Sequence, residues 1–369
     1  MKIALAHDYL NQYGGAERVL EAFSRIWPEA PIFTLVYDER RTGWAFKNKK
    51  IHTSFLQRIP LAKRYHRPLS VLMPLAVEQF DFSGYDVVLS DSASYAKGIL
   101  TPPGTLHICF CHTPIRYVWD DCHKYIEEFG YNSLIKFFIP FFTNYIRLWD
   151  EAACSRPDFY LANSKTTKRR IQKYYRRPAK VVYPPIKTAL FSPSEKQKDY
   201  FFAVGRFLPY KRFDLIVKAF NRLGLPLKIV GGGPQENELR ALAKKNIEFE
   251  GFVSEERLRY LYAHCQAFLF PQEEDFGIVA CEAMAAGRPV IAYKAGGALE
   301  MIEDGKTGVF FEKQKVADLM EAVGRFQKIK FDSRYIRQRI LEFDETIFRQ
   351  KIKNFVDEKY KQFAKANGR

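Results

Sequence analysis

The chain has 369 residues, which is more than one ordinary hydrophobic core accommodates and predicts two domains. Hydrophobic residues make up 47% of it, enough to fill two cores, and no run approaches the ~20 apolar residues of a membrane-spanning helix. The formal net charge of +16 and the isoelectric point near 9.4 indicate an anionic partner, and leave open a nucleotide, a nucleic acid or an acidic membrane surface.

The first residues, Met1–Asp8, predict a strand rather than a secretory leader, because their apolar run is too short. The cysteines have no disulfide-framework spacing, and Cys109-x-Cys111-His112 lacks the second ligand pair of a metal site. They are Cys109, Cys111, Cys122, Cys154, Cys265 and Cys281. We expect reduced thiols in a cytoplasmic protein, which is at most peripheral on the cytoplasmic face of the membrane.

The first half of the chain alternates strand and helix patterns. Near-continuous apolar runs predict the strands of a buried parallel sheet, and the Gly14-Gly15 pair leads into a helix. The predicted strands are 2–7, 32–36, 86–90, 106–111, 159–162 and 180–183, and the predicted helix is 16–23. The alternation stops at Tyr183-Pro184-Pro185, and residues 191–198 are typical of a linker.

A second alternation of strands and helices follows the linker. Its predicted strands are 200–204, 227–230, 247–252, 267–270 and 290–293, and its predicted helices are 213–223, 236–244 and 277–286. Ser254 is expected to cap the helix that begins after it. Two such series predict two doubly wound α/β domains, and the basic end of the chain, from residue 333, is helical in composition.

The stretch from Glu274 to Glu282 carries the strongest chemical signal. Its two glutamates bracket the turn Phe276-Gly277-Ile278 and the start of a helix, about 12 Å apart along the axis if most of the interval is helical. That is roughly the reach from the sugar to the ribose of a sugar nucleotide. Carboxylates accept hydrogen bonds from hydroxyls, and the helix N-terminus between them offers N–H groups to a diphosphate. Scattered acids on a surface helix are the alternative interpretation.

The segment Pro271–Gly308 resembles the signature of retaining glycosyltransferases of family 4, and the likeness extends over nearly the whole chain. The resemblance implies the α/β fold called GT-B, in which two Rossmann-like, doubly wound domains face an interdomain cleft. Residues 1–190 would bind the acceptor and residues 191–345 the nucleotide-sugar donor. The helical segment 346–369 would pack back on the first domain.

Arg206, after the first strand of the second domain, and Lys211 further on are cations that can clamp a diphosphate. They resemble the family's Gly-Arg-x4-Lys element, which implies that both stabilise the leaving nucleoside diphosphate in place of a metal ion. No Asp-x-Asp triplet occurs in the sequence, and we expect no metal and no cofactor beyond the nucleotide-sugar co-substrate. A solvated charge pair is the alternative.

His112-Thr113-Pro114 follows a predicted strand, at the edge of the sheet where α/β folds bind ligands. The same context in the family implies that His112 contacts the C6 hydroxyl of the donor sugar. By the same resemblance Gly15, at a helix start that can admit phosphate, lies close to the donor diphosphate, with a tight turn as the alternative. The resemblance also assigns to the nucleotide pocket Gly232, Phe252 and Val253.

Ser164, after Asn163, is expected to cap a helix, and the stretch that follows, 165–180, is basic and contains no acid. A solvated helix face is the default interpretation, with an anionic membrane or the acceptor diphosphate as alternatives. Two stretches, 55–65 and 137–147, mix aromatic and basic residues. We expect a surface that docks on anionic lipid and receives a polyprenyl-linked acceptor, although core packing also explains the second stretch.

These features predict a retaining, metal-independent hexosyltransferase whose catalytic residues are Glu274, Arg206, Lys211 and His112. Pro184-Pro185-Ile186-Lys187 replaces the Asn-Gly-Val-Asp of many family members and resembles bacterial mannosyltransferases of polysaccharide assembly. This implies GDP-mannose as donor and a glycan, lipid-linked acceptor. The alternatives are a nucleotide-sugar epimerase on the same fold, and a basic nucleic-acid or membrane-binding protein without catalysis. No nucleic-acid recognition motif occurs, so nucleic acid is not an expected partner.

Overall fold

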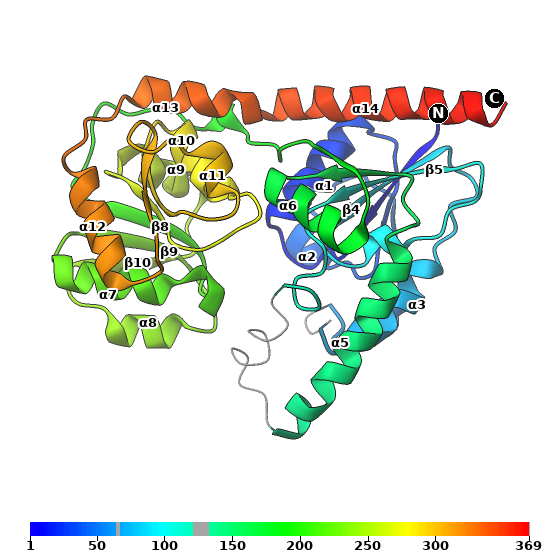
Figure 1. The fold of residues 1–369 in the computed structure, drawn as a ribbon, viewed down its shortest axis with the longest axis horizontal. Coiled ribbons are helices and arrows are strands. Elements are labelled where there is room, and N and C mark those ends of the chain that lie inside the picture. Colours follow the sequence, from blue (N-terminus) through cyan, green and yellow to red (C-terminus); the bar gives the residue numbers. More distant parts are fainter. Residues whose placement is uncertain (64–66, 121–132, 369) are drawn as a thin grey trace. The chain divides into compact units, whose positions relative to one another are not determined.

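The structure is a computed structural model that describes residues 1–63, 67–120 and 133–368. The chain forms two compact units, each with its own sheet (Figure 1). The first contains Met1–Pro185 and Thr346–Arg369, and the second contains Ile186–Glu345. The two ends of the chain therefore belong to the same unit.

The first unit is built on a seven-stranded parallel sheet with the strand order β3-β2-β1-β4-β5-β6-β7. The strands are β1 (Ile3–His7), β2 (Ile32–Thr34), β3 (Ile51–Thr53), β4 (Val87–Ser92), β5 (Leu106–Cys111), β6 (Phe159–Ala162) and β7 (Ala179–Val181). The helices are α1 (Gly15–Ile26), α2 (Glu39–Thr42), α3 (Met73–Glu78), α5 (Ser133–Ala153), α6 (Lys165–Arg170) and α14 (Glu345–Ala366). Shorter turns of helix are η1 (Phe55–Arg58), η2 (Arg67–Leu72), η3 (Ala96–Gly98) and the π-helix η4 (Ile171–Tyr175).

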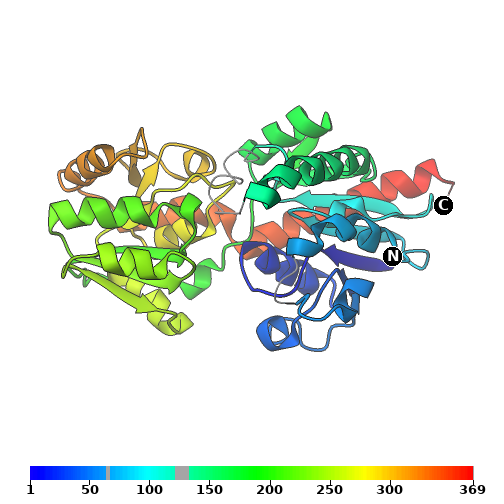
Figure 2. The same cartoon turned by 90° about the horizontal axis from the view of Figure 1, so that it is seen from below.

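Apolar side chains fill both faces of this sheet because successive residues of a strand point to opposite sides. Leu5 of β1 packs with α1 and with α14, whose Phe348 ring stacks on Phe23 of α1 at 5.7 Å between centroids. Ala4 and its neighbours on the other face pack with α3 and with the C-terminal half of α5. Helices thus cover both faces of the sheet (Figure 2).

The second unit has a six-stranded parallel sheet with the order β10-β9-β8-β11-β12-β13. The strands are β8 (Phe201–Arg206), β9 (Leu227–Gly232), β10 (Ile247–Gly251), β11 (Phe268–Phe270), β12 (Val290–Tyr293) and β13 (Gly308–Phe311). The helices are α7 (Phe213–Leu223), α8 (Glu236–Leu242), α9 (Glu255–His264), α10 (Ile278–Ala285), α11 (Ala298–Met301), α12 (Val316–Phe326) and α13 (Ser333–Ile340), with short turns η5 (Thr188–Leu190), η6 (Pro209–Lys211) and η7 (Leu341–Phe343). Phe201 packs toward α7 and α12, whereas Phe202 packs against Tyr262 of α9.

Both sheets have a topological switch point beside their first strand. In the first unit β1 lies between β2 and β4, and in the second β8 lies between β9 and β11. The loops that leave these neighbouring strands turn to opposite sides of the sheet. The carboxyl ends of strands at such a point are where open parallel α/β sheets bind their ligands.

The predicted fold class is confirmed, since both sheets are parallel and wound with helices. Ser164 and Ser254 cap helices as predicted, each accepting a backbone N–H three residues on. The sequence analysis missed β3 and β13, which are short, and α5, whose aromatic run contains Pro140. Of the cysteines, Cys122 lies outside the described residues, and the others are buried free thiols.

No helix of the described residues combines the length and the apolar character that a membrane crossing requires.

Candidate functional site

In the second unit the predicted donor residues gather at the carboxyl edge of the sheet. Arg206 ends β8, Gly232 ends β9, Phe252 follows β10, and Glu274 lies in the loop after β11. These four strands are consecutive neighbours in the sheet, so their ends meet along one edge. The strand order therefore brings these four residues to one edge of the second unit, and their roles stay predictions.

Lys211 and Glu274 form an ion pair across the switch point of this sheet. Lys211 ends η6, which follows β8, and its ammonium also lies 5.3 Å from the centroid of the Tyr210 ring. The amide of Gln272 donates to Oε1 of Glu274 at 3.3 Å. Both partners of the ion pair keep about a fifth of their side-chain surface exposed, so a ligand can reach each of them.

The Glu274 loop is held in place by backbone contacts with the Gly296-Gly297 turn. The Gly297 N–H donates to the Glu274 carbonyl at 2.8 Å. Gly296 has a φ of +58°, and a Cβ on it would come within 2.2 Å of the same carbonyl oxygen. Only glycine satisfies both conditions, because the left-handed region disfavours other residues and no room exists for a side chain. This turn therefore sets the position of Glu274.

Gly277 is the N-cap residue of α10 and has a φ of +112°, and a Cβ there would lie 2.7 Å from the Phe270 ring. In the described part of the chain, no side chain caps the α10 N-terminus at Gly277. The helix begins at Ile278, one residue later than predicted. Its N-terminus combines backbone N–H groups with the positive end of the helix dipole, a combination that attracts anions.

Glu282 lies one turn into α10 and is nearly buried, with 5% of its surface exposed. The hydroxyl of Tyr262, a fully buried residue of α9, donates to its Oε2 at 3.0 Å. This contact helps to orient the carboxylate of Glu282, whose predicted role at the ribose stays a prediction.

The predicted base pocket is partly formed by an exposed ring. Phe252 is 86% exposed, and its ring lies against Gly232, where a Cβ would approach it to 3.0 Å. Val253 beside it is half-buried. An aromatic face of this kind, with small residues beneath it, provides a stacking surface for a planar base.

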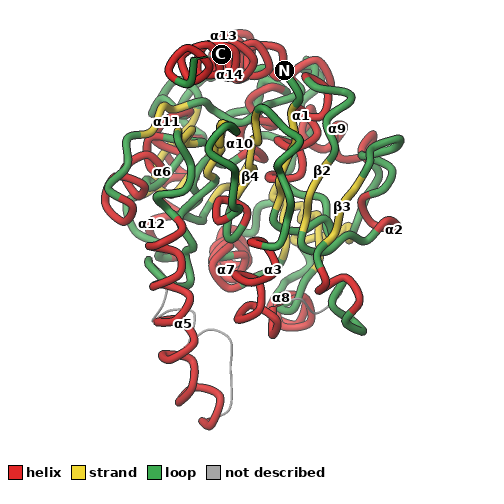
Figure 3. The backbone as a smooth tube through the Cα atoms, turned by 90° about the vertical axis from the view of Figure 1, so that its right-hand side faces the viewer, coloured by secondary structure: helices red, strands yellow, loops and turns green. Residues whose placement is uncertain are grey.

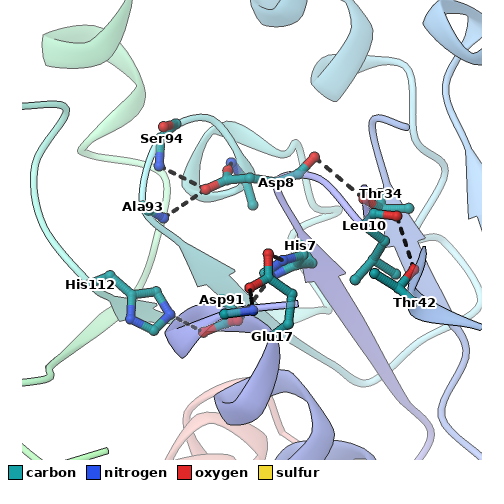
Figure 4. Close-up of polar contacts among 12 residues, drawn as sticks. His7, Asp8, Leu10, Glu17, Thr34, Thr42, Asp91, Ala93, Ser94 and His112 are labelled. Carbon is teal, nitrogen blue, oxygen red and sulfur yellow. Dashed lines mark hydrogen bonds and ion pairs between the residues drawn. The ribbon is translucent and has the colours of Figure 1, made fainter. Parts of the chain in front are cut away.

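In the first unit the predicted His112 lies at the end of a buried chain of charged groups (Figure 4). Its Nε2 is 2.7 Å from Oδ1 of Asp91, and Oδ2 of Asp91 is 2.9 Å from Nδ1 of His7. Nε2 of His7 in turn lies 3.6 Å from the Glu17 carboxylate. His7 ends β1 and is the register partner of Asp91 in β4, so the sheet itself brings the two together.

The charges in this row of four side chains favour a protonated His7. Burial opposes that charge, but hydrogen bonds to Asp91 and Glu17 and their negative charges outweigh it and raise the pKa of His7 to about 10. Burial alone would raise the pKa of Asp91, whereas the neighbouring His112 and His7 lower it below its usual value. An ionised Asp91 accepts a hydrogen bond from Nε2 of His112, which fixes the orientation of the ring and turns Nδ1 away from this contact.

A second carboxylate at the same edge organises the loop after β4. Asp8 accepts four backbone N–H groups: those of Ala93 and Ser94 at Oδ2, and those of Tyr95 and Ala96 at Oδ1 (Figure 4). The distances lie between 2.6 and 2.8 Å. Asp8 is buried, so these contacts replace the water that its charge would otherwise need.

The N-terminus of α1, where Gly15 was predicted to admit phosphate, already holds a carboxylate. Oε2 of Glu17 accepts the Gly14 N–H at 2.8 Å and forms a capping box. A phosphate approaching Gly15 would therefore meet the negative charge of Glu17, which His7 partly balances. The role of Gly15 stays a prediction.

The sequence analysis did not single out His7, Asp8, Glu17 or Asp91. A signal was present, because His7 and Asp8 follow one apolar run and Asp91 follows another. Polar residues at the carboxyl ends of two strands that pair in parallel are expected to converge. What the sequence did not contain was the pairing of the first strand with the fourth.

Basic residues of α6 and η4 are exposed, as expected of a solvated helix face: Lys168, Arg169, Lys173 and Arg176. Arg170 differs, since it pairs with Asp120 at 2.6 Å. In the stretch 55–65, which mixes aromatic and basic residues, Arg58, Leu61 and Lys63 are exposed, and residues 64–65 lie outside the described residues.

Comparison with known proteins identifies the class. Residues 13–190 match the family described as Glycosyltransferase Family 4, and residues 187–340 match Glycosyl transferases group 1. The two matches together extend over most of the chain, which therefore belongs to the glycosyltransferases, as a family 4 domain followed by a group 1 domain.

Several curated relatives are similar over parts of their length. An uncharacterised glycosyltransferase of Methanocaldococcus jannaschii is 30% identical over 183 residues, 48% of this chain and 52% of that protein. The O-antigen chain mannosyltransferase C of Escherichia coli is 34% identical over 29% of this chain and 31% of its own. A GDP-mannose-dependent alpha-(1-6)-phosphatidylinositol monomannoside mannosyltransferase of Mycobacterium tuberculosis is 35% identical. The match covers 32% of this chain and 36% of that protein. The chain thus spans about half or less of these relatives.

Solved structures share the fold over the whole chain. Anabaena HepE in complex with UDP and glucose has a TM-score of 0.72 and 18% identity, covering 97% of this chain and 99% of that one. Sucrose-phosphate synthase from Thermosynechococcus elongatus has a TM-score of 0.73 and 17% identity, covering 98% of this chain and 100% of that one. Both support the predicted GT-B fold.

We expect the contribution of His7 to stability to depend on pH. Its pKa is about 10 in the folded protein and 6.5 without the fold. A group whose pKa is raised in the folded state stabilises the fold fully below pH 6.5. This stabilisation falls progressively as the pH rises from 6.5 to about 10, where it is lost. Urea unfolding should therefore show that His7→Gln costs more at pH 6 than at pH 9, by on the order of a few kcal/mol. Asp91→Asn should flatten the same dependence. An equal cost of His7→Gln at both pH values would contradict the ion chain.

We expect Gly296→Ala to displace the Glu274 loop and to slow the enzyme. The added Cβ meets the Glu274 carbonyl at 2.2 Å, and relief requires a shift of about 1 Å, which can cost on the order of 10²-fold in rate. Gly305→Ala is the matched control, because Gly305 also has a positive φ, of +76°, but open space around it. Release of nucleoside diphosphate from the donor measures both variants. If the two lose activity equally, backbone strain rather than the Glu274 contact explains the loss.

Proposed function

We propose that the protein is a retaining, metal-independent glycosyltransferase that transfers mannose from GDP-mannose to a glycan acceptor carried on a polyprenyl lipid, in the assembly of a cell-surface polysaccharide. The observation that carries the proposal is the Lys211–Glu274 ion pair at the switch point of the second sheet, next to Arg206. It combines, within one contact, a cation suited to phosphate and an acid suited to sugar hydroxyls.

In this proposal the donor lies along the carboxyl edge of the second unit. Arg206 and Lys211 neutralise the charge that develops on the departing diphosphate, and Lys211 exchanges its contact with Glu274 for a phosphate oxygen. Glu274 accepts from the hydroxyls of the donor sugar, and Glu282, oriented by Tyr262, accepts from the ribose. Phe276, Gly277 and Ile278 present the α10 N-terminus to the diphosphate, and Gly232, Phe252 and Val253 receive the base.

The first unit completes the proposed site. His112, held through Nε2 by Asp91, offers Nδ1 as an acceptor for a hydroxyl of the donor sugar. The proposal also keeps Gly15 as a candidate phosphate contact and the first domain as the one that binds the acceptor. Same-face transfer gives the retained configuration.

The choice of mannose has two supports. The Pro184-Pro185-Ile186-Lys187 segment resembles the mannosyltransferases of polysaccharide assembly. In addition, two of the relatives carry the word mannosyltransferase in their names, one of them with GDP-mannose. UDP is present in the HepE structure, so the base is the first property to measure.

The nucleotide and its phosphate ligands can be tested together. We expect GDP and GDP-mannose to raise the unfolding temperature more than UDP, ADP and their sugars, since a ligand stabilises the state that binds it. Arg206→Ala and Lys211→Ala should each abolish most of that shift and lower turnover by on the order of 10²-fold or more. Lys218→Ala, which removes an exposed cation of α7, is the control and should leave both unchanged. Full activity of both Arg206→Ala and Lys211→Ala would refute the phosphate assignment.

Metal independence can be tested separately. Because two cationic side chains supply the positive charge that a divalent ion supplies elsewhere, we expect the transfer rate to stay within about twofold in excess EDTA. The rate is measured with and without EDTA, and again after Mg²⁺ or Mn²⁺ is added in excess. Loss of activity in EDTA with recovery on adding either ion would overturn this part of the proposal.

A further inference from the structure

Between Phe137 and Leu148, α5 presents a large apolar face to solvent. Six side chains of this face are between 46% and 64% exposed, whereas such residues are usually buried: Phe137, Phe138, Phe141, Phe142, Tyr145 and Leu148. The rings also cluster, with the Phe137 centroid 5.3 Å from that of Phe138 and 6.0 Å from that of Phe141. We call these six residues the aromatic face of α5.

The aromatic face occupies one side of the helix. At about 100° per residue, its six positions fall within an arc of about 140°, and Thr143, Asn144 and Arg147 fall outside it. An apolar stripe of this width is what a helix normally turns toward a protein core. Here it has the pattern of a buried surface but is exposed.

Three residues toward the C-terminal end of α5 fix the helix to the first unit. Ile146 is buried, the Trp149 Nε1–H donates to Glu78 at 2.8 Å, and the Arg147 guanidinium donates to the Val118 carbonyl at 2.8 Å. Beyond these contacts α5 extends away from the sheet of its own unit (Figure 3). The aromatic face is therefore carried on a continuous helix anchored near its C-terminal end, and its exposure does not require local unfolding.

The charge around the aromatic face is positive. From Ser133 to Trp149 the sequence contains no acid and two cations, Lys136 and Arg147, and the whole chain carries +16. Two copies of this surface would repel each other, because like charges oppose association. An anionic surface would attract it, so charge complementarity favours an acidic bilayer over a second copy of the chain.

The length of the face limits how it can meet a bilayer. Phe137 and Leu148 are about 16 Å apart along the helix axis, well short of the ~30 Å hydrocarbon core. A helix with a wide apolar face, a polar face and flanking cations lies in the interface, with its apolar side among the upper acyl chains.

We propose that α5 docks the enzyme on an anionic bilayer by inserting this aromatic face into one leaflet. The inference deepens the proposed function, on which it rests for its purpose, since a polyprenyl-linked acceptor is confined to a membrane. Phenylalanine and leucine enter the acyl region, Tyr145 reaches the headgroup level, and the basic residues attract acidic headgroups.

Co-sedimentation of the full chain with vesicles tests the proposal. The vesicles consist of phosphatidylcholine alone or of phosphatidylcholine with phosphatidylglycerol. We expect binding to the mixed vesicles, reduced about 10-fold or more in the triple variant Phe137→Gln/Phe141→Gln/Phe142→Gln, because membrane affinity follows the buried apolar area. The matched control is Leu100→Gln/Leu242→Gln/Leu341→Gln, which removes exposed leucines elsewhere and should bind like the wild type. Equal binding of the two triple variants would overturn the proposal.

A spectroscopic probe locates the contact. In Phe141→Trp the new indole should shift its emission to the blue on mixed vesicles and be quenched by brominated lipid, whereas in Leu100→Trp it should do neither. A Phe141→Trp signal that is insensitive to brominated lipid contradicts insertion. A dimer seen by sedimentation without lipid, and lost in the phenylalanine triple variant, would also overturn the proposal by assigning the face to a second copy.

Failure of this inference can be told apart from failure of the proposed function. The phenylalanine triple variant is expected to keep the thermal shift with the donor nucleotide, since none of its residues belongs to the donor site. If the wild type binds vesicles through α5 but no nucleotide stabilises it, docking stands and the assigned reaction does not. If nucleotides stabilise the wild type and vesicles do not bind it, the reverse holds.

Discussion

Parallel pairing of the first strand with the fourth is the constraint on which the rest of each unit depends. In the first unit the pairing of β1 with β4 makes His7 and Asp91 register partners, and their side chains meet at 2.9 Å. In the second unit the pairing of β8 with β11 brings the loop that holds Lys211 to the loop that holds Glu274. In both units, an acid and a cation from distant parts of the sequence meet at the point where the connecting loops diverge.

The two contacts differ in burial, and this difference separates their roles. The His7–Asp91 contact is closed to water, and its charges are balanced by Glu17 and His112, so breaking it would leave an uncompensated buried charge. The Lys211–Glu274 pair is partly exposed, and its partners can exchange each other for a ligand at small cost because water screens the separated charges. The first contact holds His112 through Asp91, whereas the second leaves both of its partners partly accessible.

Much of this could be predicted from the sequence. The apolar runs predicted most of the strands of both sheets because buried parallel strands are apolar on both faces. Several site residues were also accessible, since Arg206, Lys211, Glu274 and His112 stand in short motifs next to those runs. Strand order was not accessible, because periodicity says which segments are strands and nothing about which strands pair.

The residues that escaped prediction did so for physical reasons. Asp91 and Glu17 act through other side chains, and no local pattern marks a residue whose partner is distant in the sequence. The stretch 137–147 was singled out for its aromatic and basic residues, but its helical state escaped because Pro140 lies inside it. The part of Gly296 in holding Glu274 also escaped, because it depends on a carbonyl twenty-two residues earlier in the chain.

Positioning Glu274 through its backbone resolves a conflict between two demands on this residue. A carboxylate held by several side-chain hydrogen bonds would be rigid, but those bonds would occupy the oxygens that a sugar must reach. The Gly297 N–H and the close approach of Gly296 act on the carbonyl of Glu274 instead. The carboxylate keeps Lys211 and Gln272 as its neighbours. A binding site that must be both preorganised and open is best fixed through main-chain atoms, and glycine is the residue that lets two main chains approach closely enough to do so.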